Sequence, residues 1–204
     1  YARELGLKAC DDWSFMKNKF DDQESRRKGL EYLAYVRPRL VVVSFPRGPW
    51  YARLAQHETQ NEHRREIMQK HRDYLNFVKH IVESQKKRGD HWIVIGNAGS
   101  LAFEEKPLKR VAELGHVTHL DSCMYGAVYN DGLPRHAPLQ LLVSDESFLP
   151  ALSCKCNGQH SHGAPSSGTA DLEHEYPKAM AHCIVKALKV MELGTGEILA
   201  TEVG

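Results

Sequence analysis

Two short apolar runs, each ending in a turn, are the strongest features of the hydrophobic pattern. Residues 40–43 are a leucine and three valines, and a Pro-Arg-Gly-Pro turn follows shortly after them. Residues 92–95 form a second run, Trp-Ile-Val-Ile, which ends at Gly96 and Asn97. Continuous apolar runs bounded by turn residues are typical of strands buried on both faces of a sheet. The pattern therefore predicts two buried strands, each followed by a loop.

Helical and strand-like patterns alternate along the rest of the chain. Apolar residues recur at helical spacing in residues 23–36, 58–88 and 107–114, and in a last helix that opens at Tyr176 and Pro177. Shorter runs predict strands at 7–10, 116–120 and 139–143, a short helix at 146–152 and a turn at 130–132. Asp21 or Asp22 is expected to cap the first helix, which Pro38 ends. This alternation predicts a three-layer α/β fold around a mostly parallel sheet.

Length and charge narrow the class of protein. The 204 residues suit one α/β domain at 1–193 with a tail at 194–204. The net charge is close to zero, because 27 Lys and Arg residues are balanced by 26 Asp and Glu residues. Nucleic acid would therefore have to bind a local basic patch, since the chain as a whole is not a polycation. No apolar run approaches the roughly 18 residues of a membrane helix, and no signal peptide opens the chain. We expect an intracellular protein with no membrane insertion.

The segment 154–162 holds the densest group of metal-ligating side chains. Two thiols and two imidazoles lie within nine residues, at Cys154, Cys156, His160 and His162. Thiolate and imidazole are the ligands that zinc prefers, and four of them close a tetrahedron. The odd total of five cysteines favours thiols or metal ligands over a disulfide framework. Zinc is thus the candidate cofactor; the alternative is a surface loop with coincidental histidines, of which the chain has 12.

Residues 40–50 also resemble the strand and Ser-Pro-Pro-Cys-Gly-Pro-Trp loop of a cytosine-5 DNA methyltransferase-like domain found in some copia-type retroelement polyproteins. Three later segments resemble that family in the same order: Asp-Ser-Cys-Met-Tyr-Gly at 121–126, Cys-x-x-x-His-x-His at 156–162, and the Tyr-Pro helix. The resemblance runs to about Leu188 and implies a Rossmann-like methyltransferase fold. It also makes Cys123 a candidate fourth metal ligand and leaves Cys154 as an additional thiol.

The chain departs from the family at the atoms that would perform the chemistry. Arg47 stands where the family has its nucleophilic cysteine, and Phe45 replaces the first proline of the loop. A guanidinium stays protonated, so it cannot attack cytosine. Gly96 stands where the family's glutamate would protonate the cytosine ring. These replacements predict a catalytically degenerate domain, and no catalytic residue is assigned.

The family's cofactor loop is a further departure. Its Phe-x-Gly-x-Gly loop would lie just upstream of residues 2–6, and this sequence begins after it. We therefore expect the first strand to be absent, the N-terminus to be incomplete, and S-adenosylmethionine not to bind. Asp11 and Asp12 are the candidate cofactor residues, because an acidic residue after a strand binds ribose hydroxyls. The alternative for these two residues is a solvated turn.

Three hypotheses for function follow. The first is a degenerate methyltransferase-like domain retained for binding nucleic acid or a protein. The second is a structural scaffold subunit of a larger assembly, and the third is an S-adenosylmethionine-dependent DNA methyltransferase with atypical residues. The loop residues assigned to nucleic-acid or partner binding are Ser44, Pro46, Arg47, Gly48, Trp50 and Asn97.

Overall fold

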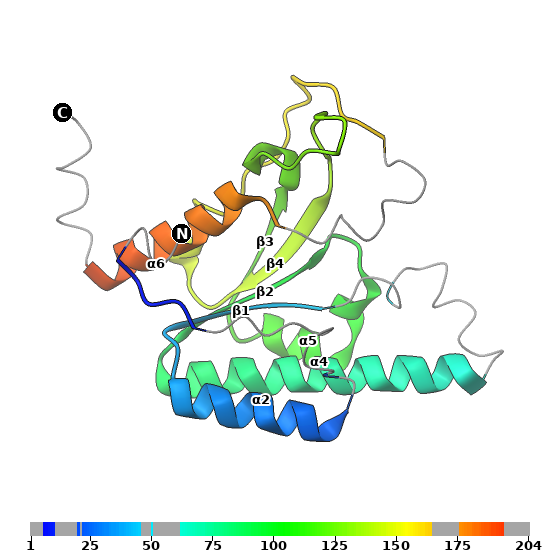
Figure 1. The fold of residues 1–204 in the computed structure, drawn as a ribbon, viewed down its shortest axis with the longest axis vertical. Coiled ribbons are helices and arrows are strands. Elements are labelled where there is room, and N and C mark those ends of the chain that lie inside the picture. The colour runs from blue at the N-terminus through cyan, green and yellow to red at the C-terminus, as the bar shows by residue number, and fades with distance from the viewer. Residues whose placement is uncertain are drawn as a thin grey trace. The chain divides into compact units, whose positions relative to one another are not determined.

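The computed structural model describes residues 6–10, 20, 22–45, 50, 62–164 and 176–193. Strands and helices alternate within these ranges, which confirms an α/β fold (Figure 1). The α-helices are α2 (Gln23–Val36), α4 (Glu62–Arg88), α5 (Lys106–Ala112) and α6 (Lys178–Leu193). The strands are β1 (Leu40–Ser44), β2 (His91–Asn97), β3 (His116–Asp121) and β4 (Pro138–Val143). Short 3-10 helices are η3 (Leu101–Glu104), η4 (Ser122–Tyr125) and η5 (Glu146–Phe148).

No helix in the described ranges is both long and apolar enough to span a membrane.

The strands form an open, mixed sheet in the order β1-β2-β4-β3. β1 and β2 run parallel, with Leu40 opposite His91 and Ser44 opposite Ile95. β2 has a neighbour on each side and residues 92–96 are buried, as the sequence predicts.

The exposure of β1 corrects one prediction. Val43 is 7% exposed and belongs to the core, but its neighbour Val42, which points to the opposite face, is 47% exposed. The prediction that β1 is buried on both faces is wrong, because the core covers only the face that carries Val43. Its apolar run is indistinguishable from that of an inner strand at the level of sequence.

The chain divides into two compact units. The helical unit comprises Cys10–Val117 and Gln140–Ser144, and the loop unit comprises Tyr1–Ala9, Thr118–Leu139 and Asp145–Gly204. The prediction of a single domain over residues 1–193 stays a prediction, and the tail at 194–204 lies outside the described residues.

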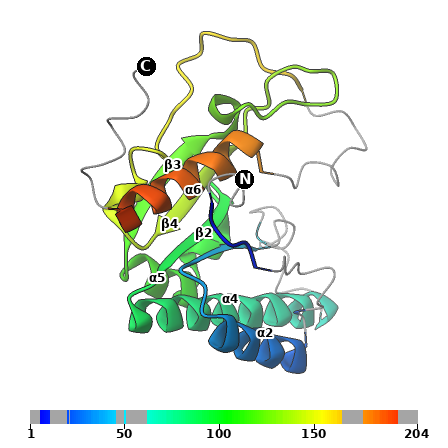
Figure 2. The same cartoon turned by 60° about the vertical axis from the view of Figure 1, so that its left-hand side comes forward.

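The long helix α4 supplies much of the core of the helical unit. Leu75, Val78 and Val82 on α4 are fully buried and belong to the same core as residues of β2. α2 lies alongside α4 in both views (Figure 1 and Figure 2). The buried Gln85 amide donates to the carbonyls of Pro38 at 3.1 Å and His91 at 2.8 Å. These bonds fasten α4 to the starts of both parallel strands.

Local sequence signals set most of the element ends. Asp22 caps α2 by accepting from Ser25 N at 2.7 Å, as predicted, and Arg37 in the left-handed region closes the helix before Pro38. The predicted turn at 130–132 forms, with the N–H of Gly132, at φ +80°, donating to Tyr129 O at 2.9 Å.

The strand predicted at residues 7–10 does not form. Lys8, Ala9 and Cys10 are exposed, whereas a strand is normally held in place by burial of one of its faces.

In the loop unit, α6 packs on the short helices. Met180, Ile184 and Leu188 form its buried stripe, and α6 contacts η4 and η5. The helix begins directly after Tyr176 and Pro177, where the sequence places it. This packing supports the segment 121–126, from which the site described next is built.

Candidate metal centre

A turn at the end of β3 positions the first candidate ligand. The strand ends at Asp121, and η4 carries Cys123 before Gly126 closes it at φ +79°. The buried Tyr125 hydroxyl donates to Ala151 O at 2.9 Å, which holds η4 beside the chain that leads to residue 154.

The loop at 154–163 carries the other candidates and is fixed at both ends. At its start, Asp121 N donates to Cys154 O at 3.0 Å; at its end, Gly163 N donates to Pro134 O at 3.0 Å. A Cβ at residue 163 would lie 2.8 Å from the Tyr129 ring, so a glycine is needed where the loop meets the turn. The loop therefore lies against β3 and the 127–134 segment within one unit.

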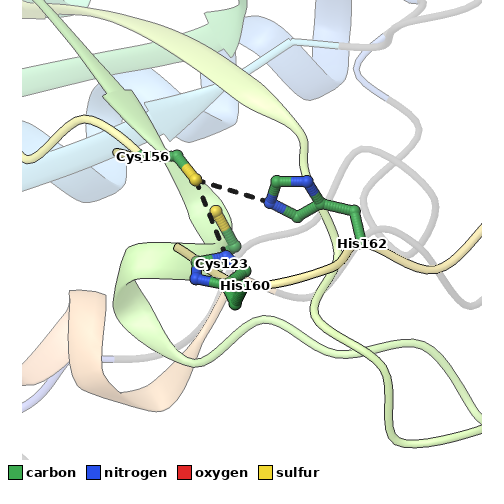
Figure 3. Close-up of side chains that lie close together, drawn as sticks. All are labelled: Cys123, Cys156, His160 and His162. Carbon is green, nitrogen blue, oxygen red and sulfur yellow. Dashed lines mark hydrogen bonds between the residues drawn. The ribbon is translucent and has the colours of Figure 1, made fainter. Parts of the chain in front are cut away.

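Four ligand atoms converge between the loop and η4. The side chains of Cys123, Cys156, His160 and His162 each offer one atom, and these atoms lie within 4.8 Å of one another (Figure 3). Cys156 Sγ lies close to both imidazoles, 3.6 Å from His160 Nε2 and 3.5 Å from His162 Nε2. The cluster brings together one thiol from η4 and three ligands from the loop.

The spacing fits a tetrahedral zinc site. With zinc bonds of about 2.0–2.3 Å, the ligand atoms of a tetrahedron stand about 3.3–3.8 Å apart. The two Cys156–histidine distances already have that length, and the remaining distances, all within 4.8 Å, need to shorten by at most about 1.5 Å. Two thiolates and two imidazoles fill all four positions, which is the pattern of a structural centre rather than a catalytic one.

The backbone around Cys156 is shaped to support a thiolate. Gly158, at φ +73°, points its N–H at Cys156 Sγ over 3.4 Å. The Asn157 side chain accepts from Gln159 N at 3.1 Å and fixes the same turn. A hydrogen bond from a backbone N–H stabilises the charged form of the sulfur, which is the form that binds metal.

The protonation of the cluster reflects its crowding. Burial, then a hydrogen bond with the Cys156 thiol, raises the pKa of Cys123 to about 11 in the metal-free protein. Loss of solvent contact, followed by the nearby His160 and His136 rings, lowers the pKa of His162. A neutral His162 is ready to bind a metal, whereas Cys123 must first lose its proton.

The structure shows which thiol completes the candidate cluster. Cys154, the additional thiol of the predicted loop, is exposed and does not belong to the cluster. Its contribution is the backbone, which accepts from Asp121 and donates to the Tyr125 hydroxyl at 3.4 Å. Cys123, distant in sequence, takes the place beside Cys156, His160 and His162.

The predicted binding loop after β1 is described only in part. Pro46, Arg47 and Gly48, and likewise Asp11 and Asp12, lie outside the described residues. Ser44 is exposed and its carbonyl accepts from the Tyr74 hydroxyl at 2.9 Å.

The other two residues assigned to that loop are less accessible. Trp50 is 2% exposed, so its ring belongs to the core and not to a binding surface. Asn97 is half-buried, and its Oδ1 has no hydrogen-bond partner among the described residues.

Aromatic rings cover the end of β2. The rings of Phe45 and Phe103 meet edge to face, with centroids 5.4 Å apart. A Cβ built on Gly96 would lie 2.3 Å from Phe45 and 2.9 Å from Phe103. The position at which the resembled family has its glutamate is thus filled by two phenyl rings.

Sequence reasoning missed the surroundings of the metal cluster. His136 stacks on the ligand His162, with ring centroids 4.8 Å apart. Its Nε2 also lies 3.4 Å from Oδ1 of Asp121. Nothing in the sequence near His136 distinguishes it from the other histidines, and its role emerges only once the loop has folded.

Comparison of the chain with protein-family models, with curated proteins and with solved structures found no match.

Proposed function

We propose that this chain is a catalytically degenerate methyltransferase-like domain, stabilised by a structural zinc ion, that binds nucleic acid. The observation that carries the proposal is the packing at Gly96, where Phe45 and Phe103 occupy the space of a catalytic acid. Phe45 itself replaces a proline of the resembled loop. Its ring fills the space that the family's glutamate would need at position 96. Paired changes of this kind support a domain that has been repacked after losing its chemistry.

The arrangement of the parallel strands also supports a binding role. β1 and β2 are parallel, and the loops that follow them lie at the carboxyl ends of their strands, where open α/β sheets bind ligands. A Rossmann-like arrangement, with Arg47 of the loop after β1 contacting phosphate, is part of the proposal. A phosphate contact needs only a cation and a reachable surface, so it survives the loss of a nucleophile.

Zinc would be held by Cys123, Cys156, His160 and His162. In a closed site with four protein ligands the ion supplies folding energy by joining η4 to the loop at 154–163. It leaves no open position for water or substrate.

The proposal is tested by binding and transfer assays on the zinc-loaded chain. We expect no methyl transfer to cytosine, and saturable binding of DNA or RNA that weakens with salt. Arg47→Ala is expected to reduce the slope of log K against log salt by about 1, the effect of one lost phosphate contact. Arg110→Ala, which removes an exposed arginine paired with Glu113, is the control and should leave that slope unchanged. Methyl transfer that a blocked pocket abolishes would refute the proposal.

A scaffold role is the second candidate, and the edge of the sheet favours it. β1 is the outer strand of the described sheet and exposes Val42, and edge strands offer unpaired backbone groups to another chain. This role predicts a partner bound at fixed stoichiometry, with binding abolished by Val42→Lys. Nucleic-acid binding in the absence of any such partner would rule it out.

A further inference from the structure

Asp121 joins the metal cluster to the sheet, although it is not one of the four ligands. It is the last residue of β3 and is 7% exposed. Its backbone N–H donates to Cys154 O at 3.0 Å, two residues before the ligand Cys156. The residue thus lies near two candidate ligands, since Cys123 follows it by two positions in sequence and the backbone that it binds leads directly to Cys156.

The carboxylate of Asp121 makes two contacts with the frame of the cluster. Oδ2 accepts from the backbone N–H of Cys156 at 2.8 Å, a length typical of a charge-assisted bond. Oδ1 lies 3.4 Å from Nε2 of His136. One buried carboxylate therefore binds the backbone of a candidate ligand with one oxygen and lies beside a histidine ring with the other, close enough for an ion pair when that ring is protonated.

His136 carries the second contact to another ligand. Its ring lies against the His162 ring, with centroids 4.8 Å apart and planes tilted by 36°. His162 Nε2 is one of the two nitrogens beside Cys156 Sγ. A ring that lies between Asp121 and His162 limits the orientations that the His162 imidazole can take.

We propose that Asp121 is the positioning residue of the zinc centre, fixing the Cys156 thiolate through its backbone and the His162 imidazole through His136. This inference rests on the zinc centre proposed above. Residues that orient metal ligands from outside typically change metal affinity by about 10–100-fold when they are replaced. A residue that merely closed the strand end would change the stability of the metal-free chain and leave the bound metal as it was.

The test compares Asp121→Asn with the wild-type full chain. Asn keeps the size of the side chain but offers one accepting oxygen instead of two. We expect zinc affinity, measured by competition with a chromophoric chelator, to fall about 10–100-fold. The absorption bands of the Co²⁺-loaded protein should shift, because the sulfur and nitrogen ligands of the ion are no longer held in the same geometry.

Two further variants complete the design. Asp145→Asn alters another aspartate of the same unit, which accepts from Ser147 N at 2.9 Å, and it should leave zinc affinity within threefold of wild type. His136→Phe removes one of the two contacts but keeps a ring beside His162, so it should weaken binding less than Asp121→Asn. Urea unfolding of the metal-free variants gives the folded fraction by which each affinity is corrected.

The outcomes separate the two proposals. If wild-type protein binds one zinc and Asp121→Asn binds it equally well with an unshifted Co²⁺ spectrum, the positioning role is refuted and the zinc centre stands. A larger loss in His136→Phe than in Asp121→Asn would also refute it. If the wild-type chain binds no zinc, the centre itself fails, and the positioning role fails with it.

Discussion

At the end of β2 the helical unit packs two phenyl rings against a bare backbone, whereas the loop unit gathers two thiols and two imidazoles within 4.8 Å. Packing at Gly96 requires only volume and apolar surface, which many side chains supply. The cluster around Cys156 requires four particular atoms near tetrahedral spacing, which random substitution destroys easily. The contrast indicates that the two regions differ in kind: one fills a core, and the other has side chains that could hold a metal ion.

The largest expected effect is that of restoring an acid at the end of β2. Gly96→Glu forces a side chain into the space of Phe45 and Phe103 and buries a charge, so we expect it to destabilise the protein by at least about 3 kcal/mol. Urea unfolding measures the loss.

A double-mutant cycle shows whether the rings are the cause. Gly96→Ala and Phe45→Ala should each destabilise the chain, while the double variant should be more stable than the two losses predict, by about 1 kcal/mol or more. Strict additivity would mean that Phe45 does not fill the position next to Gly96, and a degenerate site would then lose its main structural support.

The next largest effect is expected at the Cys/His cluster of the loop unit. Cys156→Ser removes the thiol that lies beside both imidazoles of the cluster, and zinc affinity should fall more than the roughly 100-fold seen when outer contacts are lost. Zinc should also cease to raise the melting temperature. Cys154→Ser is the matched control, because it alters an exposed thiol of the same loop outside the cluster. Equal behaviour of the two variants would show that no site forms there.

Acidity should weaken the metal centre progressively. Burial and the Cys156 thiol raise the pKa of Cys123 to about 11, so at neutral pH zinc must displace its proton. Each time the pH is lowered by one unit, zinc affinity should therefore fall by about tenfold for each thiol proton that binding releases. Titration with zinc in a weakly buffered indicator solution measures the release directly. Binding with no proton release would contradict a site made of thiolates.

The smallest expected effect concerns the turn after Cys156. Gly158 has φ +73°, so Gly158→Ala adds strain of about 1–2 kcal/mol to the turn whose N–H points at the thiol. Zinc affinity should fall by about fivefold or more. Gly132→Ala, at φ +80° and likewise free of close neighbours, carries the same strain away from the ligands. If both variants lose affinity equally, the turn has no special part in the site.

The order of elements along the chain was readable from sequence because its signals are local. The helix at Gln23–Val36 starts at its capping aspartate and ends before Pro38, and the strand at His91–Asn97 follows its apolar run. Three members of the candidate cluster, Cys156, His160 and His162, were also readable, since they lie within seven residues and carry the side chains that zinc prefers.

Contacts between distant residues were decided only by the folded chain. The exposure of Val42 depends on which face of β1 the core covers, and the choice of Cys123 over Cys154 depends on how the loop meets η4. Local signals fix the conformation of each segment, whereas its neighbours follow from the packing of the whole unit. For the same reason Asp121 acquires its place beside Cys156 and His136 only in three dimensions.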